Sequence, residues 1–291
     1  MIKIANQNLD KFVNEHYENL KGKFKDFPKN SKYSLREILT AKPKKLDEIA
    51  NWFMVLNSIE KEKYDFIKQL YKNFTNKKKR NYNAYDLAKK LNVNTCIYCN
   101  INPTYTVITK NDNKITRPEF DHFHDKKNYP ILALSFYNLI PSCHVCNSTL
   151  KGTAQFSIKT HIHPYIENFN KLANFKLKIT NSKFYYDEDG FNIKLQPKNK
   201  NDKKTQNTID AFKLNILYQN HKDIVLETIQ KQIVYNDSYI EELMRNYEGT
   251  LFKNEGDLMR LISCGYGSEE DIGKRPLLKL IGDISKELDF A

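Results

Sequence analysis

Two cysteine pairs with the same internal spacing offer the strongest metal-binding signal in this chain: Cys96-Ile-Tyr-Cys99 and Cys143-His-Val-Cys146. A Cys-x-x-Cys turn directs both sulfurs toward one point, and four thiolates complete a tetrahedral zinc site with no open position. We therefore predict a structural Zn²⁺ that joins the two ends of the segment between the pairs. Four unrelated thiols, or a redox-active pair, are the alternatives. The fifth cysteine, Cys264, stands apart, and we expect a small buried side chain there.

A second set of side chains, between and beside the cysteine pairs, could hold a catalytic ion. Asp121 offers a carboxylate and Asn147 an amide oxygen, and both are hard donors that suit Mg²⁺ or Mn²⁺. His122 could act as the general base that takes a proton from an attacking water, while the ion stabilises charge on a scissile phosphate. Because adjacent residues of a strand face opposite sides, Asp121 and His122 can share a site only if the chain bends there.

Further histidines lie within and just after this segment. His124 and His144 could contact phosphate or support His122, but we interpret them as exposed loop residues. His161 and His163 form a His-x-His pair that could bind a metal. Since no third ligand is near them in the sequence, we prefer packing or local hydrogen bonding for this pair.

The hydrophobic pattern places this chemistry on a ββα unit. Residues 105–109 and 115–121 are predicted strands around an Asn-Asp-Asn turn, and a helix is expected over 146–152. A short helical piece is predicted over 133–139, ended by Pro141. Two strands followed by a helix would bring the acidic residue, the histidine and the second cysteine pair together.

The segments on either side of the ββα unit have other periodicities. The preceding residues are predicted to be helical, and Ser34 with Glu37 predicts a capping box at one helix start. Residues 174–197 alternate between apolar and polar types around a turn, which predicts a small antiparallel sheet. Helical periodicity then returns, with one long amphipathic run over 221–247.

These patterns predict a fold of the α+β class. We expect a mainly helical protein with a central zinc-stapled ββα motif and a small antiparallel β appendage. Four regions follow along the chain: an N-terminal helical region (1–91), a metal-binding core with the four-cysteine site (92–165), the β appendage (166–200) and a C-terminal helical region (201–291).

The composition of the chain indicates which kinds of partner it can bind. Its 291 residues carry a formal net charge of +12 and give a pI near 9.2, which favours an anionic partner such as nucleic acid. Lysine supplies most of that charge, and lysine, asparagine, isoleucine and tyrosine are abundant together. An AT-rich coding genome would produce the same composition, so the charge by itself leaves both explanations open.

No feature of the sequence predicts a membrane protein. A bilayer-spanning helix needs about 18 or more consecutive apolar residues, and no such run occurs. The N-terminus lacks the apolar stretch and the small-residue cleavage site of a signal peptide, so we expect a cytoplasmic protein.

The residues singled out above resemble the HNH endonucleases, also called the ββα-metal or His-Me finger group. The resemblance rests on Asp121, His122, Asn138 and Asn147, and on the cysteine pairs, which are similar to those of the zinc-bearing branch. It implies that Asp121 and Asn147 hold a divalent ion and that His122 is the base. It further implies that Asn138 fixes a loop by bonding to backbone. The final residue is Asn in place of the second His of the family name, a variant with a weaker metal ligand.

A narrower resemblance covers about 60 residues and includes Phe120-Asp-His-Phe, Tyr129-Pro-Ile-Leu-Ala-Leu-Ser, Asn138-Leu-Ile-Pro-Ser-Cys and His163-Pro-Tyr. These segments look like the HNH proteins that are paired with ATPases in bacterial anti-phage systems, such as the Septu type and some retrons. The resemblance implies a DNA-cleaving effector that works with an ATPase partner. The chain shows no nucleotide-binding motif of its own, which agrees with this division of labour.

Two other functions remain open from the sequence. The same fold could act as an RNase, because the site would read a phosphate and the base-reading surface is unknown. Alternatively, the chain could be a non-catalytic zinc-stabilised module that binds nucleic acid or a protein.

Overall fold

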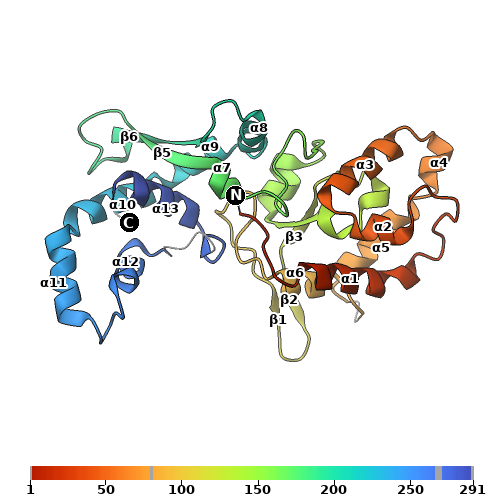
Figure 1. The fold of residues 1–291 in the computed structure, drawn as a ribbon, viewed down its shortest axis with the longest axis horizontal. Helices are drawn as coiled ribbons and strands as arrows, with labels where there is room; N and C mark the ends of the chain where they lie inside the picture. Colours follow the sequence, from red (N-terminus) through yellow and green to blue (C-terminus); the bar gives the residue numbers. More distant parts are fainter. Residues whose placement is uncertain (1, 79–80, 266–270, 290–291) are drawn as a thin grey trace. The chain divides into compact units, whose positions relative to one another are not determined.

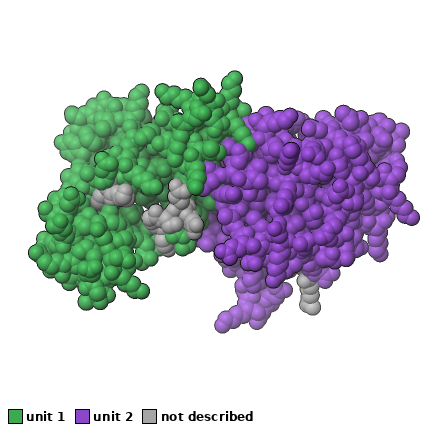
Figure 2. All heavy atoms as spheres, viewed as in Figure 1, with its two compact units in different colours: residues 1–2, 99–101, 169–291 green, residues 3–98, 102–168 purple. Residues whose placement is uncertain are grey.

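A computed structural model describes residues 2–78, 81–265 and 271–289. The chain divides into two compact units, which Figure 2 shows in different colours. Unit 1 consists of Met1–Ile2, Cys99–Ile101 and Phe169–Ala291, and unit 2 of Lys3–Tyr98 and Asn102–Asn168. The N-terminal helices and the ββα strands therefore belong to the same unit.

The first part of unit 2 is built from short helices, as the sequence predicts (Figure 1). The predicted capping box is present at α2, where Ser34 accepts from the Glu37 backbone and Glu37 accepts from the Ser34 backbone. Asn57 and Asn83 begin α4 and α6 in the same way. The helices are α1 (Leu9–Leu20), the 3-10 turn η1 (Lys21–Lys23), α2 (Leu35–Thr40), α3 (Pro43–Met54), α4 (Ser58–Glu62), α5 (Phe66–Thr75) and α6 (Ala84–Leu91).

The hairpin that follows is shorter than predicted. β1 (Val107–Ile108) and β2 (Lys114–Thr116) pair antiparallel, whereas the prediction extended these strands over 105–109 and 115–121. Pro118 separates β2 from the next strand, because proline has no N–H to continue a hydrogen-bonded ladder.

The strand pair of the ββα unit is instead formed by β3 (Glu119–His122) and β4 (Leu139–Ser142). The helical piece predicted over 133–139 is present only in part, as a 3-10 turn over 136–138, since Leu139 starts β4. Pro141 lies inside β4, opposite Phe120, and it is tolerated because each strand of a two-stranded sheet has an outer edge that needs no N–H donor. Between the strands lie the 3-10 turns η2 (Pro130–Leu132) and η3 (Phe136–Asn138).

The helix of the ββα unit is present at the predicted place, but it is a π-helix, η4 (Val145–Lys151). At its end the Gly152 N–H donates to the carbonyl of Asn147, five residues back, at 3.0 Å. π-helical winding is rare and is often found at functional sites. η4 packs against β3, so its polar side chains meet those of the strand.

Unit 1 contains the predicted antiparallel appendage and the C-terminal helices. The amphipathic run over 221–247 is split into two helices, because Asn236 interrupts it and caps the second by accepting from the Tyr239 N–H. The elements are α7 (Phe169–Leu172), β5 (Ala173–Ile179), η5 (Glu188–Gly190), β6 (Phe191–Pro197), α8 (Lys203–Ala211), α9 (Leu214–Leu217), η6 (Tyr218–His221), α10 (Lys222–Val234), α11 (Asp237–Tyr247), α12 (Glu255–Ser263) and α13 (Leu278–Glu287).

Side chains cover the outer edge of β5. The carboxylate of Asp283 accepts from the Phe175 N–H at 2.7 Å, and that of Glu287 accepts from the Leu177 N–H at 2.9 Å. Both carboxylates belong to α13. This helix therefore provides acceptors for backbone N–H groups of β5 that would otherwise need a third strand as their partner.

The outer edge of β6 is covered by two side-chain amides. Asn215 accepts from the Leu195 N–H at 2.7 Å and donates to the Leu195 carbonyl at 3.1 Å. Gln219 meets the N–H and the carbonyl of Ile193 in the same two-bond pattern. An amide side chain carries the same donor and acceptor as a peptide group, so the two residues replace a neighbouring strand.

None of the helices within the described residues combines the length and the apolar character that crossing a membrane requires.

Candidate functional site

The four paired cysteines come together as one cluster. Their Sγ atoms all lie within 4.8 Å of one another, and all four residues, Cys96, Cys99, Cys143 and Cys146, are buried. A tetrahedral zinc thiolate site has sulfurs about 3.8 Å apart, given Zn–S bonds of about 2.3 Å, so the cluster is compact enough to close on one ion. The cluster can hold a metal such as zinc.

Hydrogen bonds to the sulfurs support this interpretation. The Cys143 N–H donates to Cys96 Sγ at 3.3 Å, and the Cys146 N–H donates to Cys143 Sγ at 3.4 Å. The Asn102 side-chain amide also donates to Cys143 Sγ, at 3.3 Å. Donors directed at sulfur favour thiolates, which are the form that binds a metal.

The strand geometry separates the two residues that were predicted to share a catalytic site. In β3, Asp121 lies opposite Ile140 and His122 opposite Leu139, in regular antiparallel register. The bend that a shared site requires is not present in this register, and the side chains of Asp121 and His122 contact different partners. Asp121 instead lies on the same face of β3 as Glu119, two residues earlier.

Asp121 is buried and has partners for both carboxylate oxygens. Oδ2 accepts from the Tyr98 hydroxyl at 2.7 Å, and Oδ1 accepts from Lys151 Nζ at 3.1 Å. The Lys151 side chain is fully buried, and its ammonium also donates to the carbonyl of His122 at 2.6 Å. The charge of Asp121 is therefore balanced inside the protein by the Lys151 ammonium.

Asn147, the other expected ligand of the catalytic ion, contacts Glu119. Its Nδ2 donates to Glu119 Oε2 at 2.8 Å, and the Ser148 hydroxyl donates to the same oxygen at 3.2 Å. The other oxygen, Oε1, meets His144 Nδ1 at 2.9 Å. Partial burial pushes the pKa of Glu119 upward, but the hydrogen bonds from His144, Asn147 and Ser148 outweigh it, so this pKa lies below its usual value.

His122 is buried, and a backbone carbonyl fixes the tautomer of its ring. Its Nε2 lies 3.0 Å from the carbonyl of Ala133, and its ring packs edge-on against Tyr71 with 4.5 Å between centroids. A carbonyl only accepts, so the ring proton is on Nε2 and the neutral ring has its lone pair on Nδ1. Burial, with a smaller effect of Lys126, holds the pKa of His122 well below its usual value, so the ring is neutral.

Asn138 is completely buried and bonds only to backbone groups. Its Oδ1 accepts from the His124 N–H at 2.7 Å, and its Nδ2 donates to the carbonyls of His124 and Leu132 at 3.1 and 2.9 Å. These bonds connect the segment just after His122 to the loop around Leu132. The next residue of that loop, Ala133, provides the carbonyl that faces the His122 ring. The backbone bonding expected for Asn138 is thus present.

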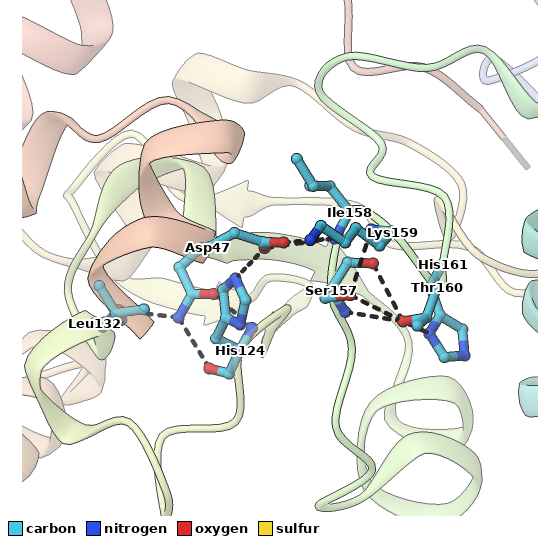
Figure 3. A network of polar contacts seen from close by, with 9 residues as sticks. Asp47, His124, Leu132, Ser157, Ile158, Lys159, Thr160 and His161 are labelled. Carbon is cyan, nitrogen blue, oxygen red and sulfur yellow. Dashed lines mark hydrogen bonds and ion pairs between the residues drawn. The ribbon is translucent and has the colours of Figure 1, made fainter. Parts of the chain in front are cut away.

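His124 differs from the sequence interpretation, which made it an exposed loop residue. Only 3% of the side chain is exposed, and its Nε2 lies 2.9 Å from Oδ1 of Asp47 on α3 (Figure 3). The same carboxylate accepts from the Ile158 N–H, at 3.2 Å for its Oδ2. Asp47 therefore connects the helical region to the loop after β3 and to the segment near residue 158.

The structure also places the remaining histidines and the fifth cysteine. His161 stacks on Phe156 with 3.7 Å between ring centroids, and His163 packs against Phe123, in agreement with the packing role preferred for this pair. Cys264 is exposed, so the prediction of burial is wrong. It follows the last residue of α12 as the C-cap and adopts the left-handed conformation, with φ of 54°.

Sequence reasoning missed Glu119, Lys151 and Asp47. The spacing of the first two could have revealed them. Glu119 precedes Asp121 by two residues and so shares its face of a strand, and Lys151 follows Asn147 by about one helical turn. Asp47 lies among the buried apolar residues of α3, and an acidic residue on an apolar helix face could have been noticed as a buried anion in need of a partner.

The fold and the cysteine cluster define a mainly helical α+β protein with a four-cysteine metal-binding site. Among known proteins, the chain is 33% identical over 88 residues to the Septu protein PtuB of Bacillus thuringiensis. That similarity covers 29% of this chain and 31% of PtuB, so it spans less than a third of either protein. No protein-family model and no solved structure matches the chain.

Proposed function

We propose that this protein is a metal-dependent endonuclease of the HNH type that hydrolyses phosphodiester bonds in DNA. The observation that carries the proposal is the geometry of His122: its Nε2 proton is held by the Ala133 carbonyl, which leaves the lone pair on Nδ1. The distant similarity to a Septu protein and the four-cysteine cluster are compatible with this assignment.

In the proposed reaction, Nδ1 of His122 takes a proton from the water that attacks phosphorus. The carbonyl of Ala133 keeps the ring in the required tautomer, and Asn138 holds the loop that presents this carbonyl. A Mg²⁺ or Mn²⁺ ion would supply charge stabilisation at the phosphate and the leaving oxygen. The products would carry 5′-phosphate and 3′-hydroxyl ends if the family chemistry applies.

The ligands of that ion are a separate part of the proposal. Asp121 and Asn147 stay the prediction made from the resemblance. In that role Asp121 would share its carboxylate between the divalent ion and the Lys151 ammonium, which bonds to Oδ1.

The biological setting is proposed from the resemblance and from the Septu relative. We place the protein as the nuclease effector of a bacterial anti-phage defence complex, with an ATPase as its partner. The net charge of +12 supports a nucleic-acid substrate, and binding to DNA would then weaken steeply with salt.

The test is plasmid nicking by the zinc-loaded protein with Mg²⁺ or Mn²⁺, with EDTA, and with a His122→Gln variant. Glutamine can still donate to the Ala133 carbonyl, but it cannot take a proton at neutral pH. We expect cleavage that needs the divalent ion and that falls at least about 100-fold in the variant, the lower range for loss of a general base.

His221→Ala is the matched control, because it changes a histidine of unit 1 and should leave nicking unchanged. Zinc content and melting temperature are measured for each variant, so that loss of the fold is not taken for loss of the base. Full activity of a folded His122→Gln variant would contradict the assignment. Cleavage of RNA but not DNA would favour the RNase alternative, and binding without any cleavage would favour the non-catalytic module.

A further inference from the structure

We propose that unit 1 contains a binding site for a nucleoside monophosphate, in the cavity lined by α12, α13 and β5 (Figure 1). This cavity has a volume of about 570 Å³, which is within the range of small-molecule sites. Its lining residues belong to unit 1, whereas the residues of the proposed nuclease site belong to unit 2. The inference is therefore independent of the proposed function.

The first argument concerns the face of α13 that lines the cavity. Leu278, Gly282 and Ser285 follow one another at spacings of four and three residues, so they share this face. Apart from the adjoining helix backbone, a Cβ added to Gly282 would meet no heavy atom within 4 Å. Glycine inside a helix costs stability relative to alanine. Here it leaves open the space that a side chain would fill.

The second argument is a buried hydroxyl that has no partner. Ser285 is 2% exposed and lines the cavity, and its Oγ makes no hydrogen bond within the described part of the chain. A helical serine can donate to the carbonyl four residues back, but this one does not. A buried polar group without a partner costs free energy, which a ligand that bonds to it would recover.

The third argument is a surplus of positive charge. Lysine or arginine occupies five positions of the cavity lining and aspartate or glutamate three, a difference of two charges. The carboxylates of Asp283 and Glu287 already bond to lysines and to N–H groups of β5. By contrast, neither Lys198 nor Lys286 forms an ion pair among the residues that the structure describes, and both are exposed. These two ammonium groups can reach an anion in the cavity.

Lys279 provides a third ammonium at the same cavity. The residue is 1% exposed, and its Nζ donates to the Ala173 carbonyl at 2.9 Å and to the Asp283 carboxylate at 2.5 Å. An ammonium has three N–H donors, so one remains for a ligand. Burial lowers the pKa of Lys279, Asp283 opposes this effect, and the charges of Lys198 and Lys286 lower the pKa further. An anion beside these lysines would offset their mutual repulsion.

The side chains of the cavity indicate the chemistry of the ligand. A phosphate monoester carries about 1.5 to 2 negative charges at neutral pH, which matches the surplus of two positive charges. Met259, Leu278 and Ile281 offer apolar surface to a ring system, and the Asn174 amide can bond to the edge of a base. A nucleoside monophosphate combines these two parts in one small molecule.

The test is isothermal titration calorimetry of the zinc-loaded, full-length protein with AMP, GMP, CMP and UMP. We expect at least one of them to bind with a Kd of about 1 mM or tighter. Inorganic phosphate and the corresponding free nucleoside should each bind at least about tenfold more weakly, because each lacks one of the two parts. No binding of any of the four at about 5 mM would overturn the inference, and so would equally tight binding of inorganic phosphate.

Two variants locate the ligand in the cavity. Gly282→Leu fills the open space and favours the helix, so the protein should fold and binding should be lost. The double variant Lys198→Gln, Lys286→Gln should weaken binding at least about tenfold, because it removes both unpaired charges. The double variant Lys178→Gln, Lys194→Gln is the matched control, since it removes two exposed lysines of β5 and β6 that do not line the cavity.

Ser285→Ala separates a hydroxyl that binds a ligand from one that supports the fold. Binding should weaken severalfold, whereas the melting temperature of the free protein should stay unchanged or rise, since the hydroxyl has no bond to lose. Normal binding by a folded Gly282→Leu variant would contradict the proposed site, as would normal binding by the Lys198, Lys286 double variant.

Discussion

His16 and His122 of unit 2 are both buried, and Nε2 of each faces a backbone carbonyl. Nε2 of His16 lies 2.8 Å from the Leu134 carbonyl, and its Nδ1 lies 2.9 Å from the Tyr82 hydroxyl. Since the carbonyl requires a proton on Nε2, the tyrosine must be the donor to Nδ1. Protonation of Nδ1 would remove the acceptor for the Tyr82 hydroxyl and place a charge in the core. Burial accordingly lowers the pKa of His16 to about 4.

This lowered pKa predicts loss of stability in mild acid. Above pH 6.5 His16 is neutral in both the folded and the unfolded chain, so its contribution is complete. As the pH falls from 6.5 toward 4, the unfolded chain binds a proton that the folded chain refuses, and the free energy of unfolding falls by up to about 3 kcal/mol. Urea unfolding of the zinc-loaded protein between these pH values measures this slope.

The His16→Gln variant should have a flatter pH dependence than the unchanged protein over the same range. His144→Gln, which changes an exposed histidine, is the matched control and should keep the original slope. A His16→Gln variant with an unchanged slope would show that other groups cause the acid sensitivity.

At the residue scale, the sequence was informative wherever local spacing alone determines a site. The two Cys-x-x-Cys units predict their cluster because each turn positions its own sulfurs, and only the pairing of the turns depends on the fold. The backbone bonds of Asn138 were likewise expected from the resemblance and are present. The partners of Asp121 and His124 could not be predicted, because Lys151 and Asp47 reach them through packing between elements far apart in sequence.

At the element scale, β5 and β6 form a two-stranded sheet whose outer edges are both met by side chains. A sheet of two strands is marginally stable by itself, and exposed edges invite pairing with other chains. Here carboxylates of α13 and amides of α9 and η6 bond to the outward backbone groups. The helices of unit 1 thereby supply polar contacts as well as an apolar cover.

Removing the amides should destabilise unit 1 measurably. We expect Asn215→Ala and Gln219→Ala each to lower its free energy of unfolding by about 1–3 kcal/mol, because each leaves a backbone N–H and a carbonyl of β6 without a partner. Hydrogen exchange at the Leu195 and Ile193 amides should accelerate in the respective variants.

Asn220→Ala is the matched control, since this exposed residue bonds only to the Leu217 carbonyl. Equal exchange rates at Leu195 and Ile193 in all three variants would show that the amides do not protect the edge of β6.

The elements that the sequence missed were those whose patterns are ambiguous. β4 is a four-residue run, Leu139–Ser142, that is buried throughout and contains a proline, so neither alternation nor length identifies it as a strand. The β5–β6 pair has extended periodicity and was predicted, as was the helical character of 221–247, although this run forms two helices. The π-helix has the same amphipathic signal as an α-helix over so few residues.

At the scale of the whole molecule, the cysteine cluster joins residues that are distant in the chain. Cys96 and Cys143 are 47 positions apart, and the segment between them contains the hairpin, β3 with His122, and β4. Cross-linking a segment of this length stabilises a protein by on the order of 4 kcal/mol through chain entropy alone.

We therefore expect Cys146→Ser to lose the bound metal and to lower the melting temperature, with loss of protection from hydrogen exchange over β3 and β4. The unchanged protein should contain about one zinc per chain by atomic absorption. Cys264→Ser is the matched control, because this exposed cysteine lies outside the cluster and should affect neither quantity. Retained zinc together with an unchanged melting temperature in Cys146→Ser would contradict a structural metal.

The π-helix η4 has a consequence for how the length of this chain can vary. One end of the helix is fixed by Cys146 in the cysteine cluster, and the other by Lys151 in its bonds to Asp121 and the His122 carbonyl. The wider winding accommodates the residues between these two attachments. With one residue fewer, this segment would wind as an α-helix. Either Cys146 would then leave the cysteine cluster or Lys151 would lose its bonds to Asp121 and the His122 carbonyl. Insertions and deletions should therefore be tolerated in the β1–β2 turn and not between Cys146 and Lys151.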